Sequence, residues 1–315
     1  MSTPLVSAVV PAYDTDGTVA RAVRSVAAQT YDPIELVVVD DCSPQPVADT
    51  LTDVDISIFA GVEVVRHEEN QGASAARNTG IGAADGDLVA FLDDDDEWRP
   101  KKLEQQVARY RETDESVQAV YTGIEQVDAT GETNAVSPAK HEGNLRKRLL
   151  FGNVVGSFSV LLAGADALAK TGPLDERFPS WQDWEYYVRL AEVTRFAAVP
   201  DPLVVRHNEG NQISRNYVTK AETSAPLFAE KYGPVAAEYG RLFHRRFRGH
   251  LAHELGYAAL ANGQCAAGRR HLLRAVALDP FQPGVYPHLL AALGGERVYE
   301  GARRLKRSLA TSGES

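Results

Sequence analysis

Residues 88–97 read Leu-Val-Ala-Phe-Leu-Asp-Asp-Asp-Asp-Glu, five apolar residues followed directly by five carboxylates. A short apolar run between two helical patterns predicts a buried strand, and the carboxylates then stand at the carboxyl end of that strand. In a parallel α/β sheet, ligands bind outside the carboxyl ends of the strands. The stretch therefore indicates both a fold class and the edge of the sheet where ligands bind.

The same alternation of strands and helices runs through the first part of the chain. Two β-branched runs, Val6–Val10 and Glu35–Asp40, come before this stretch, and helical spacing is found at Thr18–Ala28 and Ala73–Ala84. This order predicts an α/β fold, with a mostly parallel, Rossmann-like sheet covered by helices on both faces. Later expected elements are a helix at Leu145–Phe151, a strand at Ser159–Leu162 and a strand at Phe196–Arg206 that is broken by Pro200 and Pro202.

The composition predicts a folded protein whose two parts carry opposite charge. Residues 1–215 hold 19 Lys and Arg against 35 Asp and Glu, whereas residues 216–315 hold 14 against 8. We expect an α/β domain over 1–215 and a C-terminal helical extension over 216–315, where Leu255–Pro280 has the pattern of one tetratricopeptide-like helix pair. The acidic first part makes nucleic acid a poor partner. Two cysteines and the lack of a long apolar run predict a cytoplasmic protein without disulfides or a membrane span.

The residues after the first two strands suit a nucleoside pocket. Those after the first strand are Pro11, Ala12, Tyr13 and Asp14, and Asp41 follows the second. A carboxylate there can accept a hydrogen bond from a base, and the ring of Tyr13 offers a face on which a base can stack. The alternative is that Asp41 and Ser43 only form a turn.

The acidic run Asp93–Glu97 points to a divalent cation. Neighbouring carboxylates at the mouth of a sheet repel one another, and a cation removes that repulsion. Ligand sets made only of oxygen suit Mg²⁺ or Mn²⁺. The alternative is a solvated acidic turn before the helix that follows Pro100.

A glycine-entered helix, Asn70–Gly80, lies between these two regions. Its small residues allow close packing on the sheet, its first turn offers free N–H groups to an anion, and Arg77 can reach a phosphate or a base. The segment matches neither a Walker loop nor a Gly-x-Gly-x-x-Gly loop. ATPase and dehydrogenase functions are therefore disfavoured.

Four motifs together resemble the inverting glycosyltransferases of the GT-A fold, glycosyltransferase family 2: Val9–Asp14, Glu35–Asp41, Asn70–Asn78 and Phe91–Trp98. The resemblance extends over about residues 4–215 and implies a nucleotide-diphospho-sugar transferase fold. It implies nucleotide binding by Pro11, Tyr13, Asp41 and Arg77, with Ala12, Asp14 and Asp94 beside them and Asp41 on the base. It also implies that Asp93–Asp95 form the Asp-x-Asp motif, with Asp95 as the metal ligand and Asp93 nearer the ribose and the sugar.

The resemblance implies a general base at Asp183. Inversion needs a carboxylate that accepts the proton of the acceptor hydroxyl opposite the departing diphosphate. Trp181, Gln182 and Trp184 are then expected to contact sugars, although Gln182 stands where the family often has Glu. The alternative is that Asp183 only caps the helix that follows and that the tryptophans are core residues. His207 resembles a downstream histidine of the family that touches the metal or the diphosphate, and a structural role is its alternative.

These features predict a metal-dependent enzyme, with Mg²⁺ or Mn²⁺, that transfers a sugar to a glycan or a polyprenyl-phosphate-linked acceptor. A UDP-sugar is the favoured donor because Asp41 can accept the uracil N3–H, while guanosine and dTDP donors stay open. The alternative function is a non-catalytic nucleotide- or sugar-binding module with a helical interaction tail. The basic stretch Arg241–Leu251 is either a peripheral membrane contact or an ordinary helix that packs its apolar side inward.

Overall fold

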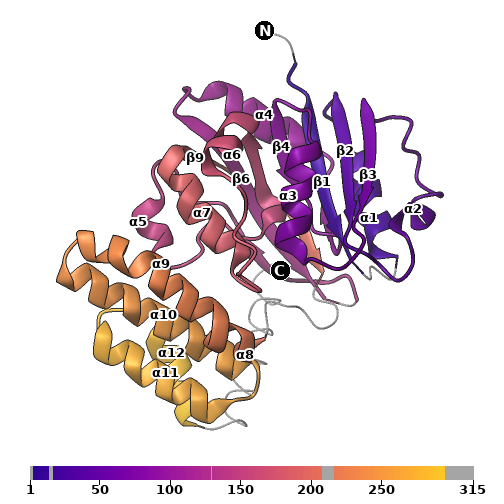
Figure 1. Cartoon of the computed structure of the whole chain (residues 1–315). Helices are drawn as coiled ribbons and strands as arrows, with labels where there is room; N and C mark the ends of the chain where they lie inside the picture. Colours follow the sequence, from indigo (N-terminus) through magenta and orange to yellow (C-terminus); the bar gives the residue numbers. More distant parts are fainter. Residues whose placement is uncertain (1–2, 14–16, 129, 208–215, 295–315) are drawn as a thin grey trace, which may run out of the picture. The chain divides into compact units, whose positions relative to one another are not determined.

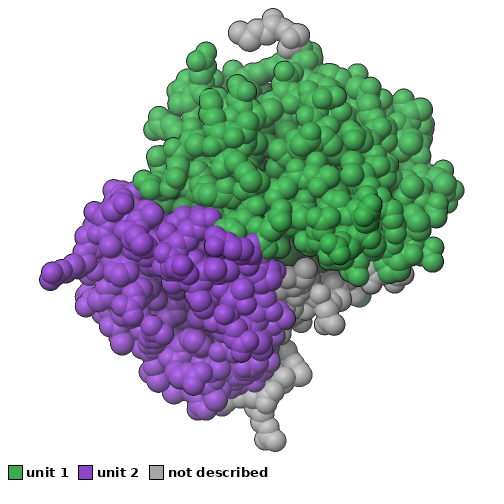
Figure 2. Space-filling view, viewed as in Figure 1, with its two compact units in different colours: residues 1–146, 154–176, 182–208 green, residues 147–153, 177–181, 209–315 purple. Residues whose placement is uncertain are grey.

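The computed structural model describes residues 3–13, 17–128, 130–207 and 216–294 (Figure 1). The chain forms two compact units (Figure 2). Unit 1 comprises residues 1–146, 154–176 and 182–208, and unit 2 comprises residues 147–153, 177–181 and 209–315. The domain boundary expected after residue 215 stays a prediction, since residues 208–215 lie outside the described part of the chain.

Unit 1 is built on a nine-stranded sheet with the order β3-β2-β1-β4-β8-β6-β9-β5, in which β7 pairs with β6. Six strands run in one direction, and β5, β7 and β8 run in the other. The strands are β1 (Val6–Ala12), β2 (Ile34–Asp40), β3 (Gly61–Arg66), β4 (Leu88–Phe91), β5 (Asp96–Trp98), β6 (Val117–Val127), β7 (Thr133–Ser137), β8 (Leu161–Gly164) and β9 (Arg195–His207). The mostly parallel α/β sheet expected of a GT-A fold is therefore confirmed.

The strand order predicts a ligand-binding crevice between β1 and β4, at the carboxyl ends of these strands. From β1 to β3 the chain moves across the sheet in one direction, and β4 then returns to the other side of β1. In parallel sheets the connections are right-handed, so helices that precede a reversal of strand order and helices that follow it lie on opposite faces of the sheet. Ligands in such sheets bind at the carboxyl ends of the two strands beside the reversal. The residues that follow β1 and β4 line this crevice.

Close packing of α3 on β1 gives the crevice a rigid wall. A Cβ atom added at Gly80 would lie 2.3 Å from Cγ1 of Val9, so only glycine allows this approach. The expected role of the small residues of this helix is thus confirmed. The helices and turns that lie wholly in unit 1 are α1 (Thr18–Ala27), α2 (Val47–Thr50), α3 (Ala73–Ala83), α4 (Lys102–Glu112), the 3₁₀ turn η1 (Phe158–Val160), α6 (Ala165–Thr171) and α7 (Gln182–Val193).

Two expected elements form with different bounds, and one expected break in a strand is not present. The strand expected at Ser159–Leu162 begins as the turn η1 and becomes β8 only at Leu161, and the helix expected at Leu145–Phe151 is the single turn α5 (Arg146–Leu149). The prolines do not break β9, because the pairing of β6 with β9 shifts register near Gly123 and so accommodates residues that lack an N–H. The antiparallel direction of β5, β7 and β8 was also not expected.

Unit 2 contains α8 (Tyr217–Thr219), the π-helical turn η3 (Lys220–Ser224), α9 (Ala225–Glu238), α10 (Arg241–Ala261), α11 (Cys265–Leu278) and α12 (Val285–Leu293). The helices α10 and α11 pack tightly, because a Cβ at Gly256 would lie 2.7 Å from Leu272 and one at Gly268 would lie 2.7 Å from Leu260. Among the helices that the structure describes, none is both long and apolar enough to cross a bilayer.

Lys102 gives a testable feature of the core of unit 1. Its side chain is fully buried, Nζ has no hydrogen-bond partner, and the amine lies 3.9 Å from the centre of the Trp98 ring. Burial lowers the pKa of this amine well below its ordinary value. Because an unpartnered buried polar group is costly, we expect Lys102→Met to raise the free energy of unfolding by about 1 to 3 kcal/mol in urea titrations at pH 7. Substitution of the exposed neighbour Lys101 by Met should change it by less than about 0.5 kcal/mol. A destabilised Lys102→Met variant would contradict this description of the core.

Candidate active site

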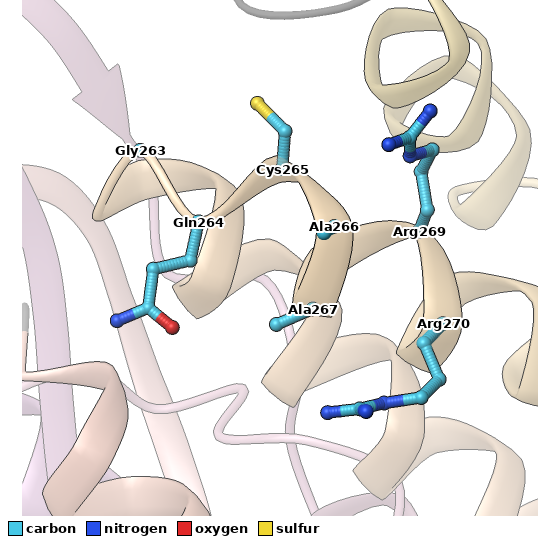
Figure 3. Close-up of a pocket in the computed structure, with 7 residues that line it drawn as sticks. All are labelled: Gly263, Gln264, Cys265, Ala266, Ala267, Arg269 and Arg270. Carbon is cyan, nitrogen blue, oxygen red and sulfur yellow. The ribbon is translucent and has the colours of Figure 1, made fainter.

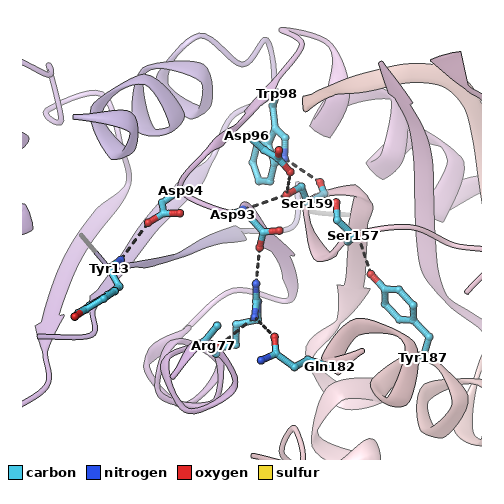
Figure 4. A network of polar contacts seen from close by, with 11 residues as sticks. Tyr13, Arg77, Asp93, Asp94, Asp96, Trp98, Ser157, Ser159, Gln182 and Tyr187 are labelled. Atoms are coloured by element: carbon cyan, nitrogen blue, oxygen red, sulfur yellow. Dashed lines mark hydrogen bonds and ion pairs between the residues drawn. The ribbon is translucent and has the colours of Figure 1, made fainter. Parts of the chain in front are cut away.

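The acidic run forms a tight loop between β4 and β5. The amide of Asp96 donates to the carbonyl of Asp93 at 3.1 Å, which closes the turn. Carboxylate oxygens of Asp93, Asp95 and Asp96 then lie within 4.8 Å of one another. Asp94 points elsewhere, since its Oδ2 accepts the backbone N–H of Tyr13 at 3.1 Å (Figure 4). Three of the four aspartates therefore face one small volume.

Burial and mutual repulsion make these carboxylates costly to ionise. Burial, opposed by the Tyr13 N–H and reinforced by its acidic neighbours, raises the pKa of Asp94 to about 7. Burial and then the charge of Asp93 raise the pKa of Asp95, and the same causes raise that of the fully buried Asp96 well above its usual range. Oδ1 of Asp96 is buried without a hydrogen-bond partner. A divalent cation with oxygen ligands fits these residues, because it would relieve the repulsion and satisfy the orphaned oxygen.

Arg77 connects the acidic loop to the start of α7. Its Nη2 donates to Oδ1 of Asp93 at 2.5 Å, and Nη1 donates to Oε1 of Gln182 at 3.4 Å. The guanidinium also lies 4.5 Å from the centre of the Phe158 ring. Arg77 is a buried residue of α3. Its charge therefore lies between the acidic loop and the start of α7.

Asp41 is buried at the end of β2, where it organises the entry to α3. Its Oδ1 accepts the N–H of Gln71 at 2.9 Å, and its Oδ2 accepts the N–H of Gly72 at 2.7 Å. Nδ1 of His67 lies 2.7 Å from Oδ1, and Nε2 of the same ring lies 2.9 Å from Oγ1 of Thr79. The carboxylate therefore fixes the glycine-entered loop. Its contact with His67 was not predicted, because the two residues are 26 positions apart.

The residues predicted after β1 lie beside the acidic loop. Pro11 and Ala12 are the last two residues of β1, and the side chain of Tyr13 is half exposed at the strand end. Such an exposed ring is available for stacking on a base. Asp14 was also predicted to bind nucleotide, but it lies outside the described residues.

Asp183 occupies the first turn of α7. Its Oδ1 accepts the N–H of Trp184 at 2.7 Å. Burial raises the pKa of Asp183, the Trp184 N–H opposes this rise, and the charge of Asp93 adds to it. The adjacent Gln182 contacts Arg77, which binds Asp93, so the start of α7 lies close to the acidic loop.

The other predicted residues of this segment have different environments. Trp184 is only 2% exposed, which favours the alternative that it is a core residue. Gln182 accepts from Arg77, as described above. Trp181 belongs to unit 2, has a positive φ of 63° and places its ring 6.1 Å from that of Phe228. Sugar contacts of Trp181, Gln182 and Trp184 stay a prediction.

His207, predicted to touch the metal, is the last residue of β9. Its Nε2 lies 2.6 Å from Oε1 of Glu97, and Arg21 Nε approaches the same oxygen at 3.4 Å. Within the described part of the chain, the group of ligand atoms around Asp95 contains only carboxylates. The metal role of His207 therefore stays a prediction.

Arg206 is a candidate residue of this site that was not predicted from the sequence. It pairs with Asp96 in the β5–β9 ladder. Its positive charge opposes the burial-driven rises in the pKa values of Asp95, Asp96 and Asp183. The signal in the sequence was its position directly before His207.

Unit 2 has its own surface features. In the basic stretch 241–251, Phe247 and Leu251 are buried, which supports ordinary inward packing of this helix over a membrane contact. An open depression at the start of α11 is lined by Gly263, Gln264, Cys265, Ala266, Ala267, Arg269 and Arg270 (Figure 3). No residue of the predicted site lies in this depression.

Comparisons with known proteins identify the family to which the chain belongs. Residues 7–166 match the model of glycosyl transferase family 2. An uncharacterized glycosyltransferase from Haemophilus influenzae is 28% identical over 234 residues, which cover 72% of this chain and 77% of that protein. TuaG from Bacillus subtilis, a putative teichuronic acid biosynthesis glycosyltransferase, is 41% identical over 104 residues, which cover 33% of this chain and 41% of TuaG.

Two solved structures share the fold. Residues 1–349 of S. aureus TarS in complex with UDP-GlcNAc superpose with a TM-score of 0.56 at 16% identity, covering 89% of this chain and 92% of the other. The mannosyltransferase PcManGT from Pyrobaculum calidifontis, in complex with GDP-Man and Mn²⁺, superposes with a TM-score of 0.59 at 17% identity, covering 94% and 88%. The chain therefore belongs to glycosyl transferase family 2 and is a glycosyltransferase.

Proposed function

We propose that this chain is a metal-dependent, inverting glycosyltransferase that uses a nucleotide-diphosphate sugar, with UDP as the favoured nucleotide. One observation carries the proposal: Arg77 contacts both Asp93 of the acidic loop and Gln182, the neighbour of Asp183. A carboxylate suited to bind a metal and the residue directly before the expected base thus share one partner, Arg77. This is the pairing that direct displacement at a sugar carbon requires.

Asp183 acts as the general base in this proposal. The acceptor oxygen forms a bond to the anomeric carbon while the bond from that carbon to the diphosphate oxygen breaks. The leaving nucleotide diphosphate keeps the electron pair, and the proton of the acceptor hydroxyl moves to Asp183. A carboxylate whose pKa is raised by burial is a stronger base than an exposed one, which suits this task.

Asp95 would hold the divalent cation, with Asp93 and Asp96 beside it. When bound, Mg²⁺ or Mn²⁺ supplies positive charge that stabilises the departing diphosphate. Arg77 orients Asp93 and adds a fixed positive charge to the same crevice. The Mn²⁺ named with PcManGT supports this choice of cofactor.

The choice of donor and acceptor rests on Asp41 and on the ligands and names of similar proteins. Asp41 at the end of β2 suits the uracil N3–H, and TarS is named in complex with UDP-GlcNAc, whereas PcManGT is named with GDP-Man. TuaG is named for teichuronic acid biosynthesis, which supports a polysaccharide or lipid-linked glycan as the acceptor. We therefore place the chain in polysaccharide biosynthesis.

Thermal unfolding with a panel of nucleotides tests this function. A ligand that binds the folded state at 100 times its Kd stabilises it by about 2.7 kcal/mol, which corresponds to a rise in Tm of about 5 to 10 °C for a domain of this size. We expect UDP with Mn²⁺ to give such a rise, and UDP with EDTA to give much less. ADP with Mn²⁺ serves as the control.

The outcomes separate the parts of the proposal. Stabilisation by GDP or dTDP in place of UDP would contradict the assignment of uridine alone. Equal stabilisation with Mn²⁺ and with EDTA would contradict metal dependence. If no nucleoside diphosphate raises the Tm at millimolar concentration, the proposed donor class is wrong.

A further inference from the structure

A short buried segment, Ser157–Ser159, contacts the acidic loop, Arg77 and α7. It begins one residue before η1, and Ser157, Phe158 and Ser159 are each less than 9% exposed. Gly156, with a φ of 126°, turns the chain into it. We call Ser157–Ser159 the bracket segment. None of its residues was singled out from the sequence.

Ser159 holds the acidic loop at three points (Figure 4). Its Oγ accepts the N–H of Asp93 at 3.1 Å and donates to Oδ2 of Asp96 at 2.6 Å. Its carbonyl accepts Nε1–H of Trp98, the last residue of β5, at 3.0 Å. One residue therefore fixes both the beginning and the end of the loop that carries Asp95. Asp96 accepts from Ser159 with Oδ2, and its buried Oδ1 has no hydrogen-bond partner.

Ser157 and Phe158 hold the helix that carries Asp183. The hydroxyl of Tyr187, on α7, donates to the carbonyl of Ser157 at 2.9 Å. The Phe158 ring lies 5.6 Å from the Tyr187 ring and 4.5 Å from the guanidinium of Arg77. The same three residues thus contact the acidic loop, the arginine that binds it and the helix of the general base.

We propose that the bracket segment is a positioning device that sets the spacing between the acidic loop and Asp183, through Ser159 on one side and the carbonyl of Ser157 on the other. This inference rests on the proposed function and deepens it. Neither Ser159 nor Tyr187 is required to touch a substrate. Their effect is exerted through the residues they hold, and outer partners of metal ligands commonly change metal affinity or activity by 10- to 100-fold.

Ser159→Ala tests the side that faces the acidic loop. We expect the Kd for Mn²⁺, measured calorimetrically with UDP present, to rise by about 10- to 100-fold. Ser159→Thr keeps the hydroxyl and should restore most of the affinity. Ser7→Ala is a matched control, because Ser7 is also fully buried, its Oγ accepts the N–H of Gly86 at 2.9 Å, and it donates to Glu35 at 2.5 Å. Ser7→Ala should lower stability without changing the Kd.

Tyr187→Phe tests the side that faces α7. Loss of its hydrogen bond should lower kcat by roughly tenfold while the affinity for UDP and Mn²⁺ stays the same, because only the position of the base changes. Tyr186→Phe is the matched control, since the hydroxyl of Tyr186 is buried without a hydrogen-bond partner and its removal should leave kcat unchanged. Equal losses in both variants would contradict the proposal.

Hydrogen exchange separates this proposal from the proposed function. In the protein without ligands, Ser159→Ala should speed exchange of the amides in residues 93–98, whereas Ser7→Ala should not. If Ser159→Ala leaves this exchange and the Mn²⁺ affinity unchanged, the positioning role of the bracket segment is wrong, and the proposed function is unaffected. If the unaltered protein binds neither nucleotide nor metal while Ser159→Ala still speeds exchange, the proposed function is wrong, and Ser159 still positions the acidic loop.

Discussion

Asp183→Asn is expected to lower the rate of sugar transfer by about 10²- to 10⁴-fold, the contribution typical of a positioned general base. The amide keeps an oxygen that can accept the N–H of Trp184, as Oδ1 of Asp183 does now, so the start of α7 should be preserved. Binding of UDP with Mn²⁺ should change little. The measurement is transfer from the donor that the nucleotide panel identifies, together with thermal stabilisation by UDP.

The control for this variant is Asp166→Asn, which alters an exposed aspartate in the first turn of another helix of unit 1, α6. It should leave the rate unchanged. The pH profile gives an independent check. Burial raises the pKa of Asp183, so this carboxylate becomes protonated at a higher pH than an exposed aspartate does. As the pH is lowered, kcat should therefore begin to fall at a higher pH than it would with an exposed aspartate as the base. An active Asp183→Asn enzyme would refute the assignment of the base.

Asp95→Asn is expected to have two effects of opposite sign. It should weaken the metal-dependent binding of UDP by at least about 100-fold, since it removes the expected ligand. Without metal, the same variant should be more stable than the unaltered protein. Burial and the charge of Asp93 raise the pKa of Asp95, which means that its ionised form is disfavoured in the folded state, and the neutral amide avoids that cost.

Melting temperatures with and without Mn²⁺ and UDP measure both effects. Asp87→Asn is the control, because Asp87 is an exposed aspartate just before β4, at the end of the strand away from the acidic loop. It should retain the full response to metal. A variant Asp95→Asn that loses stability without metal, or that keeps the metal response, would contradict the description of the acidic loop as a strained cation site.

The sequence predicted those parts of the site that follow from local pattern. The apolar run 88–92 predicted β4, and the end of that strand placed Asp93–Asp95 at the correct edge of the sheet. The glycine-entered helix and Arg77 were found for the same reason, since spacing within one helix is visible in sequence. Asp183 was predicted as the base only through the resemblance to a family, and this role stays a prediction.

The missed parts depend on contacts between distant segments. Ser159 is 66 residues away from Asp93, and Tyr187 is 30 residues away from Ser157. A serine in an expected strand gives no sign of such partners. The assignment of Asp96 to the short strand β5 was missed because pairing with β9, more than 100 residues later, decides it.

The composition of unit 2 matters for anyone who recombines this chain with a relative. Its helices begin after residue 215, but residues 147–153 and 177–181 belong to it as well. Phe151 from the first insert packs 4.5 Å from Phe243, and Ser180 from the second shares a hydrogen bond of 3.0 Å with Ser224. A chimera joined at a single point near residue 215 would pair a foreign helical region with two inserts that evolved for another partner. If all three segments of unit 2 are exchanged together, both partners of each of these contacts come from the same protein. Unit 2 is therefore a module of three separate segments, and the chain is not two domains in series.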